Sequence, residues 1–156
     1  MPAVKVTNSA GKKLKEGTDY KIKKPSGRKN VGIYTVTIEM KGDYTGKYRK
    51  TFQIIPKGTA ISSVKAKKKA FSVSWKKQAK QTSGYQIQYA VDAKFKKSVV
   101  AKNVNNTKKV KLDVSKLKAK KKYYIRVRTY KTVKVNGKSK KIYSGWSKVK
   151  AVTTKK

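Results

Sequence analysis

Residues 117–130 read LKAKKKYYIRVRTY, and the second half of this stretch shows a strict period of two. Tyr123, Ile125 and Val127 share one parity, while the positions between and after them carry two further tyrosines and two arginines. An amphipathic helix would instead repeat its apolar residues every three or four positions. The alternation therefore predicts a half-buried antiparallel strand with one apolar and one polar face.

The same period of two recurs along most of the chain, and turn-forming residues separate the runs. Asn136–Gly137 predicts a two-residue hairpin, because both residue types tolerate positive φ. Many short strands separated by turns are typical of sandwiches. We therefore predict an all-β fold of two tandem antiparallel β-sandwiches, with no helix. The other alternating runs are GIYTVTIEM (32–40), KYRKTFQII (47–55), AFSVSW (70–75) and GYQIQYA (84–90).

The composition is strongly basic, and it narrows the chemistry that the chain can support. Among 156 residues, 44 are Lys or Arg and six are Asp or Glu, so the formal charge is +38. The chain has no Cys and no His. These absences exclude disulfides, zinc sites with thiolate or imidazole ligands, and catalysis that depends on histidine. Since the six carboxylates are scattered in a positive field, we expect no metal site, no cofactor and no enzymatic activity.

The chain is expected to fold despite its charge. Its hydrophobic fraction is only 37%, but it includes ten Tyr, three Phe and two Trp. Such residues favour strands and fill cores. No run of apolar residues approaches the length of a membrane-spanning helix, so we expect no membrane insertion. The first residues, MPAVKVTNSAGKK, lack the apolar segment of a signal peptide, which leaves an intracellular protein or a part of a longer secreted chain.

A domain boundary is predicted near IIPKGTAIS, where Pro56 ends a strand and Gly58 follows at once. Proline followed by glycine is a natural hinge between domains. We expect one domain over residues 1–57 and a second over residues 58–156. The first carries 14 cations and four acids and the second 30 cations and two acids, so most of the excess charge lies in the second domain.

The second domain resembles a fibronectin type III domain over residues 59–156. FSVSW supplies the tryptophan of the second strand, Trp75, and GYQIQYA is similar to the third strand. Leu117 stands six residues before Tyr123, the spacing at which the family forms its tyrosine corner. SGWSKVKAVTT resembles the final strand.

The first domain resembles a bacterial immunoglobulin-like repeat in the motifs PAVKV, LKEGTDYKI, NVGIYTVTIEMKGDYTG and TFQIIPK. The family pattern begins upstream of PAVKV, so its first strand is expected to be missing from residues 1–57. Both domains are similar to modules of Gram-positive surface proteins, where they occur in tandem as non-catalytic parts. The resemblance therefore implies an extracellular or cell-surface location.

The acidic residues are expected to serve the fold. The closest carboxylates in sequence are Glu16 with Asp19 and Glu39 with Asp43, whereas a glycosidase needs two carboxylates facing each other across a cleft. The segment EGTD favours a turn in which Asp19 caps its own backbone. Asp113 is expected to cap the loop after the strand that ends at Leu112.

One polar face of the predicted sheet combines arginines with aromatic residues. It is expected to consist of Arg126, Arg128, Tyr124, Tyr130 and Trp146, with Gln86 and Gln88 on the neighbouring strand and Trp146 on the final strand. Arg, Tyr and Trp dominate binding hot spots, so the face is a candidate platform for a glycan or a protein. It is also similar to the Arg–Trp ladder beside the WSXWS box of cytokine-receptor fibronectin domains, although only SGWS matches. Both interpretations remain open.

Lysine clusters are candidate contacts to polyanions. Lysine acts as a point charge, and 40 of the 44 cations are Lys, whereas base reading favours the planar fork of Arg. Most clusters fall in predicted loops or strand ends, and the loops of a sandwich gather at its two ends. The favoured contacts are Lys118, Lys120, Lys121, Lys122, Lys138, Lys140 and Lys141.

These observations predict a non-catalytic spacer or adhesion module of a secreted or cell-surface bacterial protein. The expected partner is an anionic cell-wall polymer such as teichoic acid, or an acidic glycan. One alternative is an accessory module that binds a glycan or a protein beside a secreted enzyme. Another is a non-specific nucleic-acid binder, active at low salt. The sequence leaves the oligomeric state open.

Overall fold

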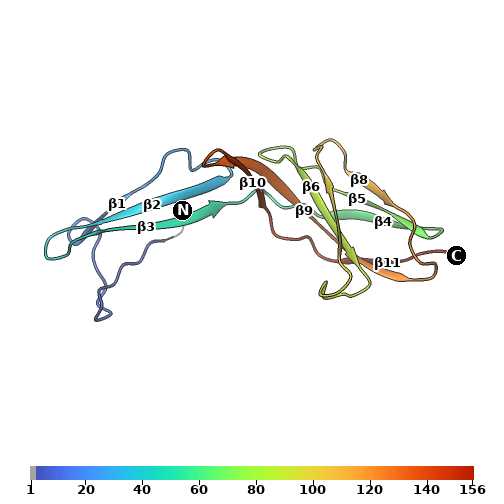
Figure 1. Ribbon diagram of the computed structural model, residues 1–156, viewed down its shortest axis with the longest axis horizontal. Helices are drawn as coiled ribbons and strands as arrows, with labels where there is room; N and C mark the ends of the chain where they lie inside the picture. The colour runs from blue at the N-terminus through green and yellow to red at the C-terminus, as the bar shows by residue number, and fades with distance from the viewer. Residues whose placement is uncertain (1–2) are drawn as a thin grey trace. The chain divides into compact units, whose positions relative to one another are not determined.

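Strands account for all the regular secondary structure of residues 3–156, which the computed structural model describes (Figure 1). All the strands pair in antiparallel fashion, which confirms the predicted all-β class. The chain divides into two units, Met1–Ile54 and Ile55–Lys156. None of the described residues forms a helix with the length and apolarity needed to cross a bilayer.

The first unit is built on one sheet in the order β1-β2-β3. Its strands are β1 (Tyr20–Lys23), β2 (Gly32–Met40) and β3 (Lys47–Ile54). The residues before β1 fold back as a hairpin, in which the Leu14 N–H donates to the Val6 carbonyl over 3.0 Å. Leu14, Tyr20 and Ile38 form a small buried core between this hairpin and the sheet. Among the described residues β3 pairs with β2 alone, so its second edge is open.

The second unit consists of two sheets. The first sheet has the order β4-β5-β8, with β4 (Ile61–Lys67), β5 (Ala70–Trp75) and β8 (Lys111–Val114). The second has the order β10-β9-β6-β7, and β11 also pairs with β9; its strands are β6 (Gly84–Ala90), β7 (Val100–Val104), β9 (Lys122–Val135), β10 (Lys138–Tyr143) and β11 (Lys150–Thr153). Because β9 is 14 residues long, it pairs with β6, β10 and β11 along different parts of its length.

The core of the second unit lies between these sheets, as the alternating runs predict. Phe71, Val73 and Trp75 of β5 join Ile87 of β6 and Val127 of β9 in one buried cluster. Each of these side chains is at most 2% exposed. Burial of such residues contributes about 1.5–3 kcal/mol each.

Two local motifs that the sequence predicts are present in the second unit. The Tyr123 hydroxyl accepts a hydrogen bond from the Lys118 N–H over 3.3 Å, and Leu117 packs against the core. This arrangement ties the loop before β9 to the sheet. At the hairpin between β9 and β10, Asn136 and Gly137 have φ values of 49° and 77°, which confirms the predicted turn.

Candidate functional site

Two arginines of β9 lie opposite two glutamines of β6. The register pairs Arg126 with Gln88 and Arg128 with Gln86. In each pair, Nε and Nη2 of the guanidinium donate to the glutamine Oε1 at 2.7–3.0 Å. Directly opposite residues of an antiparallel pair point to the same face of the sheet. These paired bonds therefore hold both guanidinium groups in fixed orientations on one face.

Aromatic rings cover the guanidinium groups. The ring centroid of Trp146 lies 4.4 Å from Cζ of Arg126 and 4.1 Å from Cζ of Arg128. Two guanidinium groups this close to one indole cannot share a face, so Trp146 is sandwiched between them. Phe95 lies 4.1 Å from Cζ of Arg126, and Tyr143 lies 3.8 Å from Cζ of Arg128. We call this stack of Phe95, Arg126, Trp146, Arg128 and Tyr143 the ladder; its contacts lie within the range of cation–π attraction.

The segment that carries Trp146 is fastened to β9 by the two serines of SGWS. The N–H groups of Ser144 and Ser147 donate to the carbonyls of Thr129 and Val127, at 3.0 and 2.8 Å. The hydroxyls of the same serines accept from the Thr129 and Val127 N–H groups, at 3.0 and 3.1 Å. The prediction that Trp146 lies on the final strand was wrong, because β11 begins only at Lys150. Each serine uses its backbone and its side chain, and the segment therefore docks without regular strand pairing.

The ladder lacks a negative charge. Burial lowers the pKa of both Arg126 and Arg128, and the nearby Arg126 charge lowers that of Arg128 further. Guanidinium nevertheless remains protonated in proteins. Neither arginine forms an ion pair within residues 3–156, and Nη1 of each has no acceptor there. The stack can thus hold the SGWS segment on β9 while keeping one edge of each cation unbonded.

The two tyrosines that were expected on this face behave differently. Tyr124 is half-buried and outside the ladder, and Lys122 Nζ lies 5.5 Å from its ring centroid. Tyr130 is only 2% exposed, so its assignment to an accessible face was wrong. Its partner across the sheet is Gly84, whose missing side chain lets the tyrosine ring lie over β6. The Tyr130 hydroxyl then donates to Oδ1 of Asn105, out of reach of a ligand.

Comparison with known proteins identifies the second unit. The profile of the fibronectin type III domain matches residues 56–145. The chain belongs to the fibronectin type III family. The match confirms the resemblance drawn from Trp75 and Tyr123. Fibronectin type III domains are typically non-catalytic and are common in extracellular and cell-surface proteins.

A solved structure of fibronectin domains agrees with this fibronectin type III assignment at the level of the fold. The chain is similar to the FN1–FN3 domains of chicken CNTN1, with a TM-score of 0.53 and 22% identity. The similarity covers 81% of this chain and 44% of that chain, so this chain spans less than half of its length. A β-1,2-glucanase from Parabacteroides distasonis gives a TM-score of 0.46 and 15% identity, over 78% of this chain and 18% of the other. No curated protein gives a match.

The lysines predicted to contact polyanions lie in two parts of the fibronectin type III unit. Lys118, Lys120 and Lys121 are exposed in the loop before β9, and the exposed Lys122 begins that strand. Lys138, Lys140 and Lys141 belong to β10, which begins at Lys138 directly after the Asn136–Gly137 turn. Strand alternation puts Lys138 and Lys140 on one face of the sheet and Lys141 on the other. Lys141 Nζ lies 4.7 Å from the Tyr130 ring centroid, and the three lysines do not form one patch.

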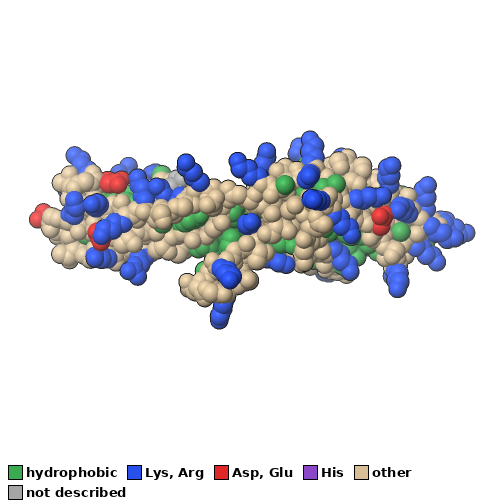
Figure 2. Space-filling model, turned by 90° about the horizontal axis from the view of Figure 1, so that it is seen from above, with side chains coloured by type: hydrophobic (Ala, Val, Ile, Leu, Met, Phe, Trp, Pro, Cys, Tyr) green, Lys and Arg blue, Asp and Glu red, His purple; other side chains and the backbone are tan. Residues whose placement is uncertain are grey.

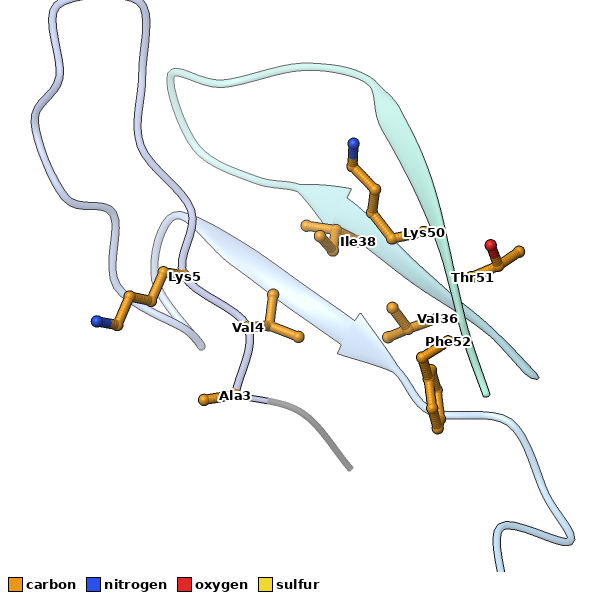
Figure 3. Close-up of a pocket in the computed structure, with 8 residues that line it drawn as sticks. All are labelled: Ala3, Val4, Lys5, Val36, Ile38, Lys50, Thr51 and Phe52. Carbon is orange, nitrogen blue, oxygen red and sulfur yellow. The ribbon is translucent and has the colours of Figure 1, made fainter. Parts of the chain in front are cut away.

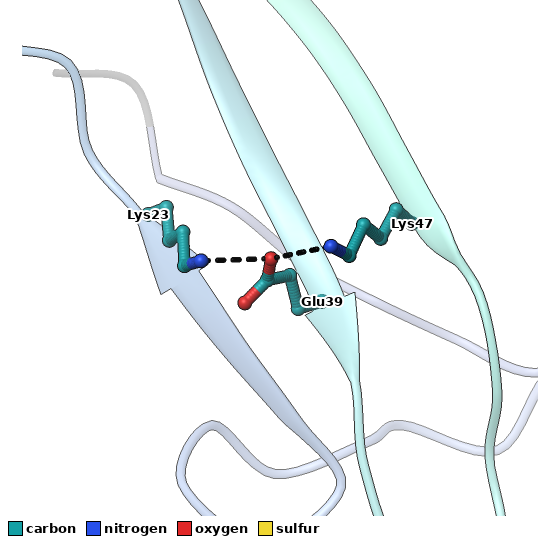
Figure 4. A network of polar contacts seen from close by, with 3 residues as sticks. All are labelled: Lys23, Glu39 and Lys47. Atoms are coloured by element: carbon teal, nitrogen blue, oxygen red, sulfur yellow. Dashed lines mark ion pairs between the residues drawn. The ribbon is translucent and has the colours of Figure 1, made fainter.

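Four of the acidic residues, Asp19, Glu39, Asp92 and Asp113, make contacts within the local structure. Glu39 lies between Lys23 and Lys47 (Figure 4). Its Oε1 atom is 2.9 Å from Nζ of Lys23 and 3.3 Å from Nζ of Lys47. Asp19 Oδ2 accepts from the Lys15 N–H within a turn, as predicted from the sequence. Asp113 was wrongly placed in a cap: it lies in β8 and pairs with Lys67. No group of three acidic, Cys or His residues in the part of the chain described here could hold a metal ion.

Sequence reasoning missed two members of the ladder. Tyr143 lies opposite Tyr130 in the register of β9 with β10. Counting this register back from the predicted Asn136–Gly137 turn would have placed Tyr143 two residues from Arg128 along β9, so the hairpin was a usable signal. Phe95 lies in the connection between β6 and β7, with a φ of 53°. No periodicity marks it, because a loop residue reaches the stack only through the tertiary path of the chain.

Proposed function

We propose that this chain is a non-catalytic spacer and adhesion module of a secreted or cell-surface bacterial protein, held to anionic polymers by its lysines. The proposal rests on the large excess of cations over acidic residues, 44 against six. Lys23, Lys47 and Lys67 reach a carboxylate, and with six Asp and Glu residues in the whole chain most of the 44 cations have no acidic side chain to balance them. On the face seen in Figure 2, Lys and Arg side chains stand out along the surface, whereas few acidic side chains appear. Most of the +38 charge is therefore open to external anions.

The kind of cation supports general attraction to polyanions over sequence-specific recognition. Of the four arginines, Arg126 and Arg128 are stacked in the ladder, which limits their freedom to read a ligand. Lysines hold phosphate as mobile point charges. A wall polymer with repeated phosphates, such as teichoic acid, fits such a surface, and so does an acidic glycan. A preceding immunoglobulin-like repeat over residues 1–57, as in Gram-positive surface proteins, would suit a tandem spacer.

The test is parallel binding to teichoic acid, an acidic glycan and duplex DNA over a salt series. Binding by charge alone predicts similar affinities for the three and a linear fall of log K with log salt. One variant changes Lys118, Lys120, Lys121 and Lys122 to Gln, and another changes Lys138, Lys140 and Lys141 to Gln. Each should flatten the slope roughly in proportion to the charges removed. Affinity that is independent of salt would contradict the proposal.

A second candidate function follows from the unbonded Nη1 edges of Arg126 and Arg128. A glycan or protein that accepts from these edges would make the ladder an accessory binding face beside a secreted enzyme. Such binding should survive about 0.3 M salt, where surface charges are strongly screened. It should also be lost in an Arg126→Lys variant, which keeps the charge and loses the planar fork. If Arg126→Lys binds all three polymers as the parent protein does, the ladder is not the binding face.

A further inference from the structure

A groove lies in the first unit, beside the open edge of β3. It has a volume of about 270 Å³ and is lined by Ala3, Val4, Lys5, Val36, Ile38, Lys50, Thr51 and Phe52. Figure 3 shows Val4 pointing toward the sheet, Lys50 reaching over from β3, and Thr51 pointing away. Val36 and Ile38 are less than 9% exposed and belong to β2, so the inner wall of the groove is apolar.

The row of β3 side chains that borders this groove is largely uncovered. In the register with β2, Tyr48 lies opposite Ile38 and Phe52 opposite Tyr34. Tyr48 is 57% exposed although it shares the face of the buried Ile38. Phe52 is half-buried and stacks on Tyr34 with ring centroids 5.7 Å apart. The sheet thus keeps an apolar margin along its outer strand that the hairpin before β1 does not cover.

The outer backbone edge of the same strand has no pairing strand among residues 3–156. β3 extends over eight residues and is an edge strand among the described residues. An exposed edge strand is a template for a further strand, and many recognition domains bind peptides in this way. β3 also carries Lys47, Arg49 and Lys50 and has no acidic residue. Cations on an edge oppose pairing with another cationic strand.

The two faces of β3 differ in chemistry. Lys50 and Phe52 share the face of the groove, whereas Lys47 and Arg49 lie on the opposite face, opposite Glu39 and Thr37. On that face, Lys47 is paired with the carboxylate of Glu39. Arg49 lies opposite Thr37 and forms no ion pair with Glu39, so its charge is the one available to a ligand at the open edge. Because side chains of an added strand alternate between faces, one set would meet the apolar groove and the other would meet Arg49.

We propose that the edge of β3 binds an extended peptide in which branched aliphatic residues alternate with acidic residues. The aliphatic side chains enter the groove beside Val36 and Phe52, and the carboxylates lie beside Arg49. Main-chain hydrogen bonds to β3 supply affinity and the alternation supplies specificity. A second copy of this chain fits poorly, because two β3 edges would bring like charges together. The site belongs to the first unit, whereas the lysines that test the proposed function, Lys118–Lys122 and Lys138–Lys141, belong to the second, so each proposal can fail alone.

The probe is a fluorescein-labelled nine-residue peptide of alternating Glu and Val, measured by fluorescence anisotropy at about 0.15 M salt. The matched control peptide alternates Glu and Gly, with the same charge and spacing but no side chains for the groove. We expect the Glu–Val peptide to bind at least about tenfold more tightly, a difference of about 1.4 kcal/mol. Equal affinity for the two peptides would overturn the proposal, because it would show attraction by surface charge alone.

Protein variants locate the binding. Arg49→Glu and Phe52→Ser should each weaken the Glu–Val complex at least about fivefold. The control is Lys24→Glu, which makes the same charge reversal in the loop after β1 and should weaken the complex less than about twofold. Amide shift mapping by NMR should place the perturbation on residues 3–5 and 47–54, and it reports the folding of each variant. Shifts confined to the lysines around residues 118–122, or a dimer in sedimentation that Phe52→Ser abolishes, would overturn the proposal.

Discussion

Replacing Trp146 with alanine removes the central ring of the ladder and tests whether the stack is a structural clamp. In the parent protein this indole separates two cations and covers one face of each, at 4.4 and 4.1 Å. Without it, the guanidinium groups keep their bonds to Gln86 and Gln88 but face solvent and each other. The segment with Ser144 and Ser147 keeps its backbone bonds and loses its only large anchor. We therefore expect the second unit to be destabilised.

The magnitude follows from the contacts. A cation–π contact contributes about 0.5–1 kcal/mol when exposed and about 2 kcal/mol when desolvated. Because both arginines are half-buried, about 1 kcal/mol for each contact is appropriate. Lost burial of a half-exposed indole adds about 1 kcal/mol. The expected loss is about 3 kcal/mol in the free energy of unfolding, or at least about 12 °C in the melting temperature of a unit of this size.

The chain provides its own reporter for this measurement. It contains two tryptophans, so Trp146→Ala leaves Trp75 as the single one. Trp75 is 2% exposed in the core of the second unit, and the first unit has no tryptophan. Its emission during urea unfolding therefore follows the second unit alone. Lys148→Ala, an exposed neighbour, is the control and should change stability by less than about 0.5 kcal/mol.

A loss below about 1 kcal/mol in Trp146→Ala would refute the clamp, since surface substitutions rarely exceed about half that value. A double-mutant cycle with Arg128→Lys then separates stacking from burial. The lysine keeps the charge but not the planar surface, so the two changes should be non-additive by about 0.5–2 kcal/mol. Strictly additive losses would show that Trp146 acts through burial only.

Three further outcomes are expected. Gly84→Ala should destabilise the second unit by about 3 kcal/mol or prevent folding, because its Cβ would lie 2.2 Å from the Val104 carbonyl oxygen; unchanged urea unfolding would contradict this packing. Thermal stability should rise between low and moderate salt, since screening weakens repulsion among 44 cations; a falling melting temperature in calorimetry would refute it. Lysine partners or backbone N–H donors lower the pKa of Glu39, Asp92 and Asp113 in the folded state. The stability from these groups is therefore full above about pH 4.3 and is lost as pH falls through the lowered values, so circular dichroism should show melting temperatures that drop below about pH 4 and not before.

Local alternation was enough to predict the strands and the core of the second unit. Phe71, Val73 and Trp75 alternate along one run, and Tyr123, Ile125 and Val127 alternate along another. These two sets become the inner faces of the two sheets. The Asn-Gly turn was equally local. A period of two requires only that one face be apolar, so these features are determined by neighbours in the sequence. The same alternation placed Arg126 and Arg128 on the outer face.

Features that depend on which segments meet in space required the tertiary structure. Tyr130 has the parity of Arg128, yet it is buried because the register places it opposite a glycine. The stack is complete only because the β6–β7 connection brings Phe95 to one end and β10 brings Tyr143 to the other. The apolar groove beside β3 likewise depends on how far the N-terminal hairpin covers the sheet. The sequence alone determined the faces of the strands and the excess of positive charge, whereas register and loop paths, which arise from contacts between distant residues, decided which side chains form a site.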